Sequence, residues 1–303
     1  MSFYNSLHVI ICNLLFLANI SVVSAQEEYV PKNKLNKITD NICTFTGDYG
    51  NATVLYGDDG ILFVDSKNPA LFDDMLKQIS VMCTQPVKYL INTHWHGDHV
   101  GGNSVFAELG ALIIAQENTL KHLSSKIFME YYNGERQPIP VENRPVITFS
   151  EEIKLYFDNE EVEMKHYIAH TDGDAVVYFK NANVISVGDI YFSSYYPYIG
   201  IEAGGSINYM IDAIAVILEN IDDNTIIIPG HGPISNKKGF SDYHHMLIDI
   251  RDNIQPQINA GKSLEEIQQS KPTQKYDDPW GIDFLGPEGF VKLVYMDLIR
   301  FKK

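Results

Sequence analysis

Short apolar runs that end in turn residues alternate along this chain with segments of helical periodicity. The apolar runs predict strands at 41–45, 53–56, 61–65, 87–92, 111–115, 146–149, 153–157, 162–168, 175–179, 183–186 and 225–228. Apolar residues at helical spacing predict helices from Asn68-Pro69 to about Ser80 and over 102–109, 117–123, 207–221 and 240–260. A capping box over 263–266 opens a further short helix, and Pro287 starts the last one.

The two halves of the chain repeat one order, in which strands are followed by a helix and then by another strand. This order predicts a layered core of mixed α and β structure. No Pro/Gly-rich linker or low-complexity run divides residues 26–303. We therefore expect a single domain over 26–303, with a core at about 40–235 and C-terminal helices at 240–303.

Two segments depart from this regular pattern. Residues 125–146 lack periodicity and contain the Gly- and Pro-bearing segments Tyr131-Tyr132-Asn133-Gly134 and Pro138-Ile139-Pro140. They are therefore predicted to form a long loop, and long loops in compact domains are often functional. The glycine-rich joint at 47–51 connects two predicted strands and indicates a hairpin.

A dense group of metal-ligand residues follows the predicted strand at 87–92. His94 and His96 are two residues apart on an extended segment, so their side chains point the same way and can hold one ion. Asp98 and His99 fall where the chain must turn and can face a second ion. Nitrogen and carboxylate ligands suit zinc, and iron and manganese accept the same donors.

Three later residues of the same types stand at the ends of short apolar runs. His170 precedes Thr171, Asp189 follows the predicted strand at 183–186, and His231 follows the one at 225–228. A sheet delivers side chains at strand ends to one edge, so these residues are candidates for completing the metal site.

At these residues the chain resembles the metallo-β-lactamase superfamily, whose hallmark is His-x-His-x-Asp-His on the loop after a strand; the resemblance covers roughly residues 40–235. It implies an αββα sandwich, in which two mixed sheets carry helices on their outer faces and the metal site lies along one edge. It also implies two zinc ions. The first would be bound by His94, His96 and His170, the second by Asp98, His99 and His231, with Asp189 bridging them.

The resemblance further implies a hydrolase in which a metal-bound hydroxide attacks a carbonyl carbon, with Asp98 and Asp189 as catalytic residues. Two departures from the family pattern matter. The segment His170-Thr171-Asp172-Gly173-Asp174 replaces the common His-Thr-Pro-Gly-His, and its aspartates favour turn capping. Phe192 stands where one group of lactamases has a lysine that holds the substrate carboxylate.

Residues after Asp189 are candidates for a substrate wall. The segment 191–198 is rich in tyrosine and serine, so Phe192, Ser193, Ser194 and Tyr195 are predicted to border the pocket, although such aromatic clusters commonly serve packing. Trp95, between two ligands, is expected to point away from the metals. The remaining histidines are interpreted as surface or packed residues.

The formal net charge of −16 and the pI of about 4.9 argue against a nucleic-acid partner, because such binding depends on Lys and Arg that neutralise phosphates. A small-molecule substrate is expected instead. The charge says nothing about the oligomeric state.

Residues 1–25 contain no Lys, Arg, Asp or Glu and include an apolar core at 9–18, followed by the small residues Val23-Ser24-Ala25. This is the pattern of a signal peptide, although its first part lacks positive charge, and the alternative is an uncleaved anchor with a short apolar core. We expect cleavage after Ala25, a periplasmic or secreted enzyme, and membrane association only through the signal peptide. Cys43 and Cys83 would then remain, either as a disulfide or as two buried thiols.

Three functions are consistent with these features. The leading hypothesis is an exported dinuclear zinc hydrolase of a small cyclic amide or ester, with β-lactams as the best-motivated substrates. The second is a lactonase or thioesterase on the same frame. The third is a non-hydrolytic redox or binding protein in which the same ligands hold iron.

Overall fold

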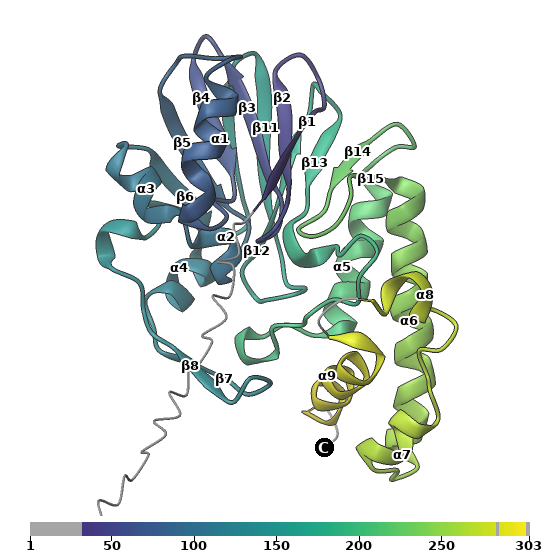
Figure 1. The fold of residues 1–303 in the computed structure, drawn as a ribbon. Coiled ribbons are helices and arrows are strands. Elements are labelled where there is room, and N and C mark those ends of the chain that lie inside the picture. Colours follow the sequence, from purple (N-terminus) through teal and green to yellow (C-terminus); the bar gives the residue numbers. More distant parts are fainter. Residues whose placement is uncertain (1–31, 283–284, 301–303) are drawn as a thin grey trace, which may run out of the picture. The chain divides into compact units, whose positions relative to one another are not determined.

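Two β-sheets form the centre of the computed structural model, which describes residues 32–282 and 285–300 (Figure 1). The first sheet has the strand order β1-β2-β3-β4-β5-β6-β9. Its strands are β1 (Asn33–Lys37), β2 (Ile42–Gly47), β3 (Ala52–Gly57), β4 (Gly60–Val64), β5 (Val87–Asn92), β6 (Leu112–Gln116) and β9 (Ile147–Phe149). Pairing is antiparallel from β1 to β4 and parallel from β4 to β9, so the sheet is mixed.

The second sheet has the order β10-β11-β12-β13-β14-β15. Its strands are β10 (Glu152–Phe157), β11 (Glu160–Tyr167), β12 (Asp174–Phe179), β13 (Val184–Ser186), β14 (Ile226–Ile228) and β15 (Ser235–Asn236). β13 and β14 pair in parallel, and the other neighbouring strands named here pair antiparallel. As a result, β13 and β14 end at the same edge of the sheet, as β4 and β5 do in the first sheet.

Three apolar clusters show how the layers pack. The inner faces of the sheets meet in one cluster, which includes Leu62 and Ile91 from the first sheet and Val177 from the second. A second cluster joins the outer face of the first sheet to the helices α1 (Phe72–Ile79) and α3 (Asn103–Glu108). The third joins the outer face of the second sheet to α5 (Ile207–Glu219), α6 (Lys237–Asn259) and α9 (Gly286–Arg300). The predicted αββα sandwich is therefore confirmed.

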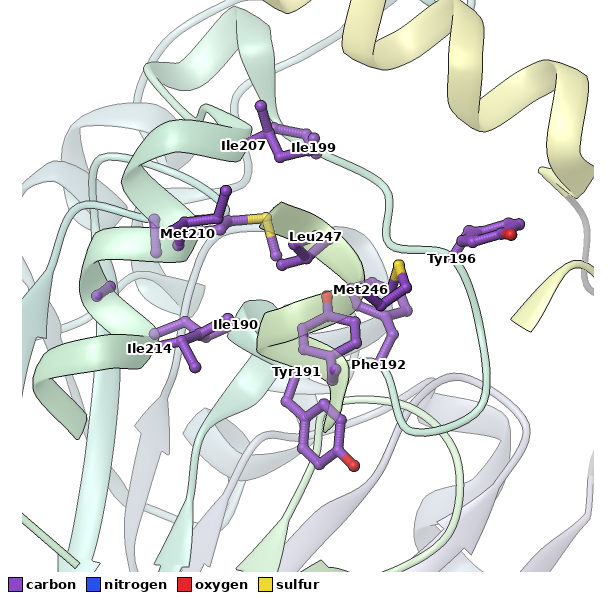
Figure 2. Close-up of a cluster of buried hydrophobic side chains, with 14 of the residues drawn as sticks. Ile190, Tyr191, Phe192, Tyr196, Ile199, Ile207, Met210, Ile214, Met246 and Leu247 are labelled. Atoms are coloured by element: carbon purple, nitrogen blue, oxygen red, sulfur yellow. The ribbon is translucent and has the colours of Figure 1, made fainter. Parts of the chain in front are cut away.

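The helix α5 illustrates why the sequence folds in this way. Its buried residues Ile207, Met210, Ile214 and Ile217 recur at helical spacing, and the Ser206 side chain caps its first turn. Figure 2 shows Met210 and Ile214 near Leu247 from α6 and Ile190 from the second sheet's edge. The remaining helices are α2 (Gly97–Val100), α4 (Glu117–Leu123), α7 (Leu264–Gln269) and α8 (Asp277–Trp280).

The predicted long loop at 125–146 is wrong in part. It contains a two-stranded antiparallel sheet of β7 (Ile127–Met129) and β8 (Gly134–Arg136). Each strand has three residues, too few to produce a recognisable alternation of apolar and polar positions. A contact with a residue far away in the sequence anchors this hairpin. Arg136 donates to the Trp95 carbonyl, and its guanidinium lies 4.7 Å from the Trp95 ring centre.

The predicted hairpin at 47–51 is present and connects β2 to β3. Its end is tied to the loop after β14, because Asn51 donates from its backbone to Gly230 O and from its side chain to Pro229 O and Gly232 O. Lys67 is fully buried and donates to the Gly50 carbonyl. These contacts hold the base of the hairpin in one position.

The two cysteines of the described residues, Cys43 and Cys83, are free thiols in the cluster beneath α1. Burial raises the pKa of the Cys43 thiol to about 12, so this thiol is unreactive near neutral pH. The predicted signal peptide at 1–25 lies outside the described residues. Within the described part of the chain, no helix has both the length and the apolar character that a membrane crossing requires.

We expect Phe63→Ala to destabilise the protein by about 3–5 kcal/mol, because removing a fully buried ring leaves a cavity. Phe63 is 0% exposed and contacts the Phe106 ring edge-on at 5.0 Å between centres. Urea denaturation measures the change. Tyr156→Ala on β10 is the control, because Tyr156 is 73% exposed and should change stability by no more than about 0.5 kcal/mol. Equal effects of the two substitutions would contradict this account of the core.

Candidate metal centre

All seven predicted ligands meet at the edge where β5, β13 and β14 end, and they form two groups. In each group the candidate ligand atoms lie within 4.8 Å of one another. The first group consists of His94, His96, His170 and Asp189, and the second of Asp98, His99 and His231.

The change from strand to helix after β5 separates the ligands of the two groups. His96 is extended, with φ −68° and ψ 152°, and α2 begins at Gly97. His94 and His96 therefore leave an extended segment on one side, whereas Asp98 and His99 lie on the first turn of a helix. The sequence predicts the turn, and the structure identifies it as α2.

The first group is buried and its ring nitrogens converge. Nδ1 of His96 lies 3.1 Å from Nε2 of His94 and 2.8 Å from Nε2 of His170. Oδ2 of Asp189 lies 3.6 Å from Nε2 of both His94 and His170. Burial lowers the pKa of His94 well below its ordinary value and that of His170 to about 3. The two rings are therefore neutral and can offer lone pairs.

The second group shares the carboxylate of Asp189 with the first. Oδ1 of Asp189 lies 3.0 Å from Nε2 of His99 and 3.5 Å from Nε2 of His231, while its Oδ2 faces the first group. Nε2 of His231 also lies 3.0 Å from Oδ2 of Asp98. One carboxylate thus offers a separate oxygen to each group, which is the arrangement of a bridging ligand.

Positive charge is favoured at the second group. Burial lowers the pKa of His231, but Asp189 and Asp98 outweigh burial and raise this pKa to about 9. Burial raises the pKa of Asp189, yet the neighbouring His99, His231 and His94 bring it well below its ordinary value. The ionised carboxylates therefore stabilise a positive charge here, whether protons on the rings or a cation carry it.

The residues present fit divalent metal ions. Among the described residues, Nε2 of His99 and Oδ1 of Asp189 are buried and make no hydrogen bond, although they lie only 3.0 Å apart. Buried polar atoms without partners are costly, and a cation between nitrogen and oxygen donors would satisfy them.

Neighbouring groups orient three of the ligand rings. Nδ1 of His99 lies 2.8 Å from Oδ2 of Asp65, and the same carboxylate accepts hydrogen bonds from the backbone and hydroxyl of Thr93. Nδ1 of His170 lies 2.8 Å from Tyr198 O, and Nδ1 of His94 lies 3.1 Å from Oγ1 of Thr93. Fixing the second nitrogen of an imidazole holds the first toward a metal.

Close backbone packing at the centre requires glycine at position 230. A Cβ atom on Gly230 would lie 2.0 Å from Oδ1 of Asp189. The backbone of Gly230 also accepts the hydrogen bond from Asn51 that anchors the 47–51 hairpin. The loop bearing His231 can therefore approach Asp189 only without a side chain at this position.

A cleft of about 180 Å³ opens onto the second group. Besides the ligands His96, Asp98, Asp189 and His231 it is lined by Gly97 and by the apolar and aromatic residues Met129, Tyr132, Phe192 and Tyr198. The Phe192 ring stacks on His231 with 4.8 Å between centres, and Tyr132 stacks on Tyr198 at 5.4 Å. Phe192 was predicted to border the pocket and does so.

The other predicted wall residues lie elsewhere. Ser193 is buried and its backbone N–H donates to His231 O, and neither it nor Ser194 lines the cleft. Tyr195 lines a neighbouring depression beside the 47–51 hairpin. The backbone at Ser194 has a φ of 74°, and the depression that Tyr195 lines also includes His231. Met129 and Tyr132 replace them, and both come from the β7–β8 hairpin that the sequence did not reveal.

The remaining predictions concern residues outside the ligand set. Trp95 is fully buried in a separate apolar cluster with Val100, as expected. Oδ1 and Oδ2 of Asp174 accept hydrogen bonds from the Thr171 hydroxyl and backbone, as the turn-capping interpretation predicts. Asp172 instead pairs with His122, with 2.6 Å between Oδ1 and Nε2.

The family model of the metallo-beta-lactamase superfamily matches residues 45–233. The chain belongs to this superfamily. Together with the two ligand groups, this membership identifies a metal-dependent hydrolase.

Individual members of the superfamily are distant from this chain. A metallo-beta-lactamase type 2 from Bacillus sp. (strain 170) is 23% identical over 240 residues, which cover 73% of this chain and 88% of the relative. A hydroxyacylglutathione hydrolase from Pelagibacter ubique (strain HTCC1062) is 31% identical over 108 residues, or 35% of this chain and 37% of the relative.

Two solved structures show the same fold. A metallo-beta-lactamase from Pontibacter korlensis has a TM-score of 0.59 at 19% identity and covers 72% of this chain and 100% of its own. A stereoselective inverting sec-alkylsulfatase from Pseudomonas sp. has a TM-score of 0.69 at 15% identity, over 87% of this chain and 50% of its own.

We expect Asp65→Asn to weaken metal binding by about 10–100-fold at the second group, because the amide cannot both accept from Thr93 and hold Nδ1 of His99 as the carboxylate does. Competition with a chromogenic chelator measures the affinity. Asp40→Asn is the control, because this carboxylate is fully exposed and pairs with Lys37 on the surface. An Asp65→Asn variant that binds metal as tightly as the unsubstituted protein would contradict this role.

Proposed function

We propose that this chain is a dinuclear zinc hydrolase that cleaves a small cyclic amide or ester. The observation that carries the proposal is the position of Asp189, whose Oδ2 faces His94 and His170 while its Oδ1 faces His99 and His231. A carboxylate placed in this way can bind two ions at once. Donor sets of imidazole nitrogen and carboxylate oxygen suit zinc.

Bound zinc ions supply a Lewis acid for the carbonyl oxygen and lower the pKa of water, which yields a nucleophile at neutral pH. The side chains of this chain determine where the reaction takes place. Asp98 offers Oδ2 to the second group, so its other oxygen, Oδ1, can accept a hydrogen bond from the attacking water and orient it. Asp98 and His231 are 30% and 25% exposed at their side chains, so substrate meets the second group first.

The aromatic cleft favours a substrate that is uncharged where it contacts the wall. Met129, Tyr132 and Phe192 present apolar surface, and Tyr198 directs its hydroxyl to the carboxylate of Glu202. Among the described lining residues there is no Lys or Arg to pair with a substrate carboxylate. A stacked aromatic wall instead buries an acyl chain or ring of a neutral ester.

Two substrate classes follow from different observations. β-Lactams are supported by the metallo-beta-lactamase type 2 relatives, which this chain matches over 88% of their length. Neutral lactones or thioesters are supported by the cleft lining and, over a shorter segment, by the hydroxyacylglutathione hydrolase relative. The cleft geometry favours the second class. We also propose that the enzyme is exported, on the pattern of residues 1–25.

We expect Asp189→Ala to lose at least one of two zinc ions and to lower the turnover of any substrate by about 10²-fold or more, since one change removes an oxygen from each group. Elemental analysis of purified protein measures the stoichiometry, and removal with a chelator followed by zinc addition tests reversibility. Asp158→Asn, a carboxylate in a distant turn that accepts from Asp59 N, is the control. A single tightly bound ion in the unsubstituted protein would overturn the dinuclear proposal.

A substrate panel separates the two classes. The zinc-loaded protein is assayed with nitrocefin, with an uncharged lactone that carries an acyl side chain, and with a thioester, each with and without chelator. We expect a higher kcat/KM for the lactone or thioester than for nitrocefin, because the described residues that line the cleft include no Lys or Arg to pair with the carboxylate of nitrocefin. Faster hydrolysis of nitrocefin would show that β-lactams are the preferred substrate class. No turnover of any of the three substrates would contradict the proposed hydrolase of small cyclic amides and esters.

A further inference from the structure

His96 differs from the other buried ligand rings because no neighbour fixes its second nitrogen. Its Nδ1 points to His94 and His170, so its Nε2 points away from the first group. This Nε2 is buried and makes no hydrogen bond among the described residues. His94, His99 and His170 each have a partner at the second nitrogen, so His96 requires an acceptor of its own.

The group that faces this nitrogen is the carboxylate of Glu202. Its Oε1 lies 3.7 Å from Nε2 of His96, and its side chain is 4% exposed. Both carboxylate oxygens accept from the Tyr198 hydroxyl, at 3.3 and 3.2 Å. An approach of about half an ångström would complete a hydrogen bond to His96.

The C-terminal helix α9 holds the turn that carries Glu202. In the sequence, this turn (Ile201–Ala203) follows His170 and precedes α5. Arg300 donates to Ile201 O at 2.6 Å and to Gly205 O at 2.8 Å, on either side of the turn. Asp297 is fully buried and accepts from the Ser206 hydroxyl at 2.9 Å and from Ile207 N at 2.8 Å. An ion pair of 2.5 Å joins Asp297 to Arg300.

We propose that Glu202 is a positioning residue that accepts a hydrogen bond from Nε2 of His96, and that Asp297 and Arg300 of α9 hold it in place. The family model ends at residue 233, so α9 lies outside the part of the chain that it matches. The C-terminal helix thereby supports the first metal group, at a distance from the ligands. This inference rests on the proposed metal centre, and it adds that α9 supports that centre.

The test measures metal binding at each group separately. Glu202→Ala removes the acceptor, and the ion held by His94, His96 and His170 should bind about 10–100-fold more weakly. Binding at the group of Asp98, His99 and His231 should be unchanged. Glu202→Gln keeps a carbonyl oxygen that can accept from His96, so it should recover part of the affinity. Asp297→Asn should show an intermediate loss, because the turn is loosened while Glu202 remains.

Stepwise chelator competition gives the two affinities, and the absorption of cobalt-substituted protein reports the geometry of the first group. Thermal melting shows whether each variant is folded. Asp277→Asn is the matched control, because this carboxylate also accepts from a tyrosine hydroxyl, that of Tyr196 at 2.9 Å, but lies on α8. It should bind both ions normally.

The outcomes separate this inference from the dinuclear proposal. Suppose that the unsubstituted protein binds two ions and that a folded Glu202→Ala variant binds each of them as tightly as the unsubstituted protein does. The role of Glu202 is then overturned, while the dinuclear centre stands. If the unsubstituted protein binds one ion, the dinuclear proposal fails, and the effect of Glu202→Ala on that ion still decides the inference. Equal losses in Glu202→Ala and Asp277→Asn would also overturn it.

Discussion

The structure depends on seven nitrogen and carboxylate ligands that point at one another, five of them buried and two, Asp98 and His231, partly exposed. Converging lone pairs inside a protein repel each other, and burying them without partners costs free energy. These ligands lie at one edge of the sandwich, where the Asp189 carboxylate faces four histidine rings. Bound divalent cations would satisfy these donors together.

The sandwich makes this convergence feasible because parallel pairing brings strand ends to one edge. β4 and β5 deliver Asp65 and the segment of His94, while β13 and β14 deliver Asp189 and His231. Asp65 has a positive φ of 65°, an uncommon conformation for a residue with a side chain, and from it reaches both Thr93 and His99. Backbone strain is thus tolerated where a side chain orients a metal ligand.

The ligands could be predicted from sequence because their signal is local. His94 to His99 share one short segment, and His170, Asp189 and His231 each close a recognisable apolar run. The supporting residues gave no such signal. Glu202 follows a short irregular segment and reaches His96 only through tertiary packing, and Tyr132 lies on a hairpin with three-residue strands. Ser193 and Ser194 illustrate the opposite error, since sequence proximity to Asp189 did not place them in the cleft.

The two ligand groups differ in exposure, and this difference divides their roles. His94 and His170 are 0% exposed, whereas His231 and Asp98 border the cleft. An ion held by the first group would be bound by buried side chains, although His96 and Asp189 also line the cleft, so its affinity would depend on how firmly the rings are held. An ion held by the second group would lie beside more exposed ligands and would exchange more readily. We therefore expect substitutions at Glu202 and Asp297 to change metal affinity, and substitutions in the aromatic wall to change substrate preference.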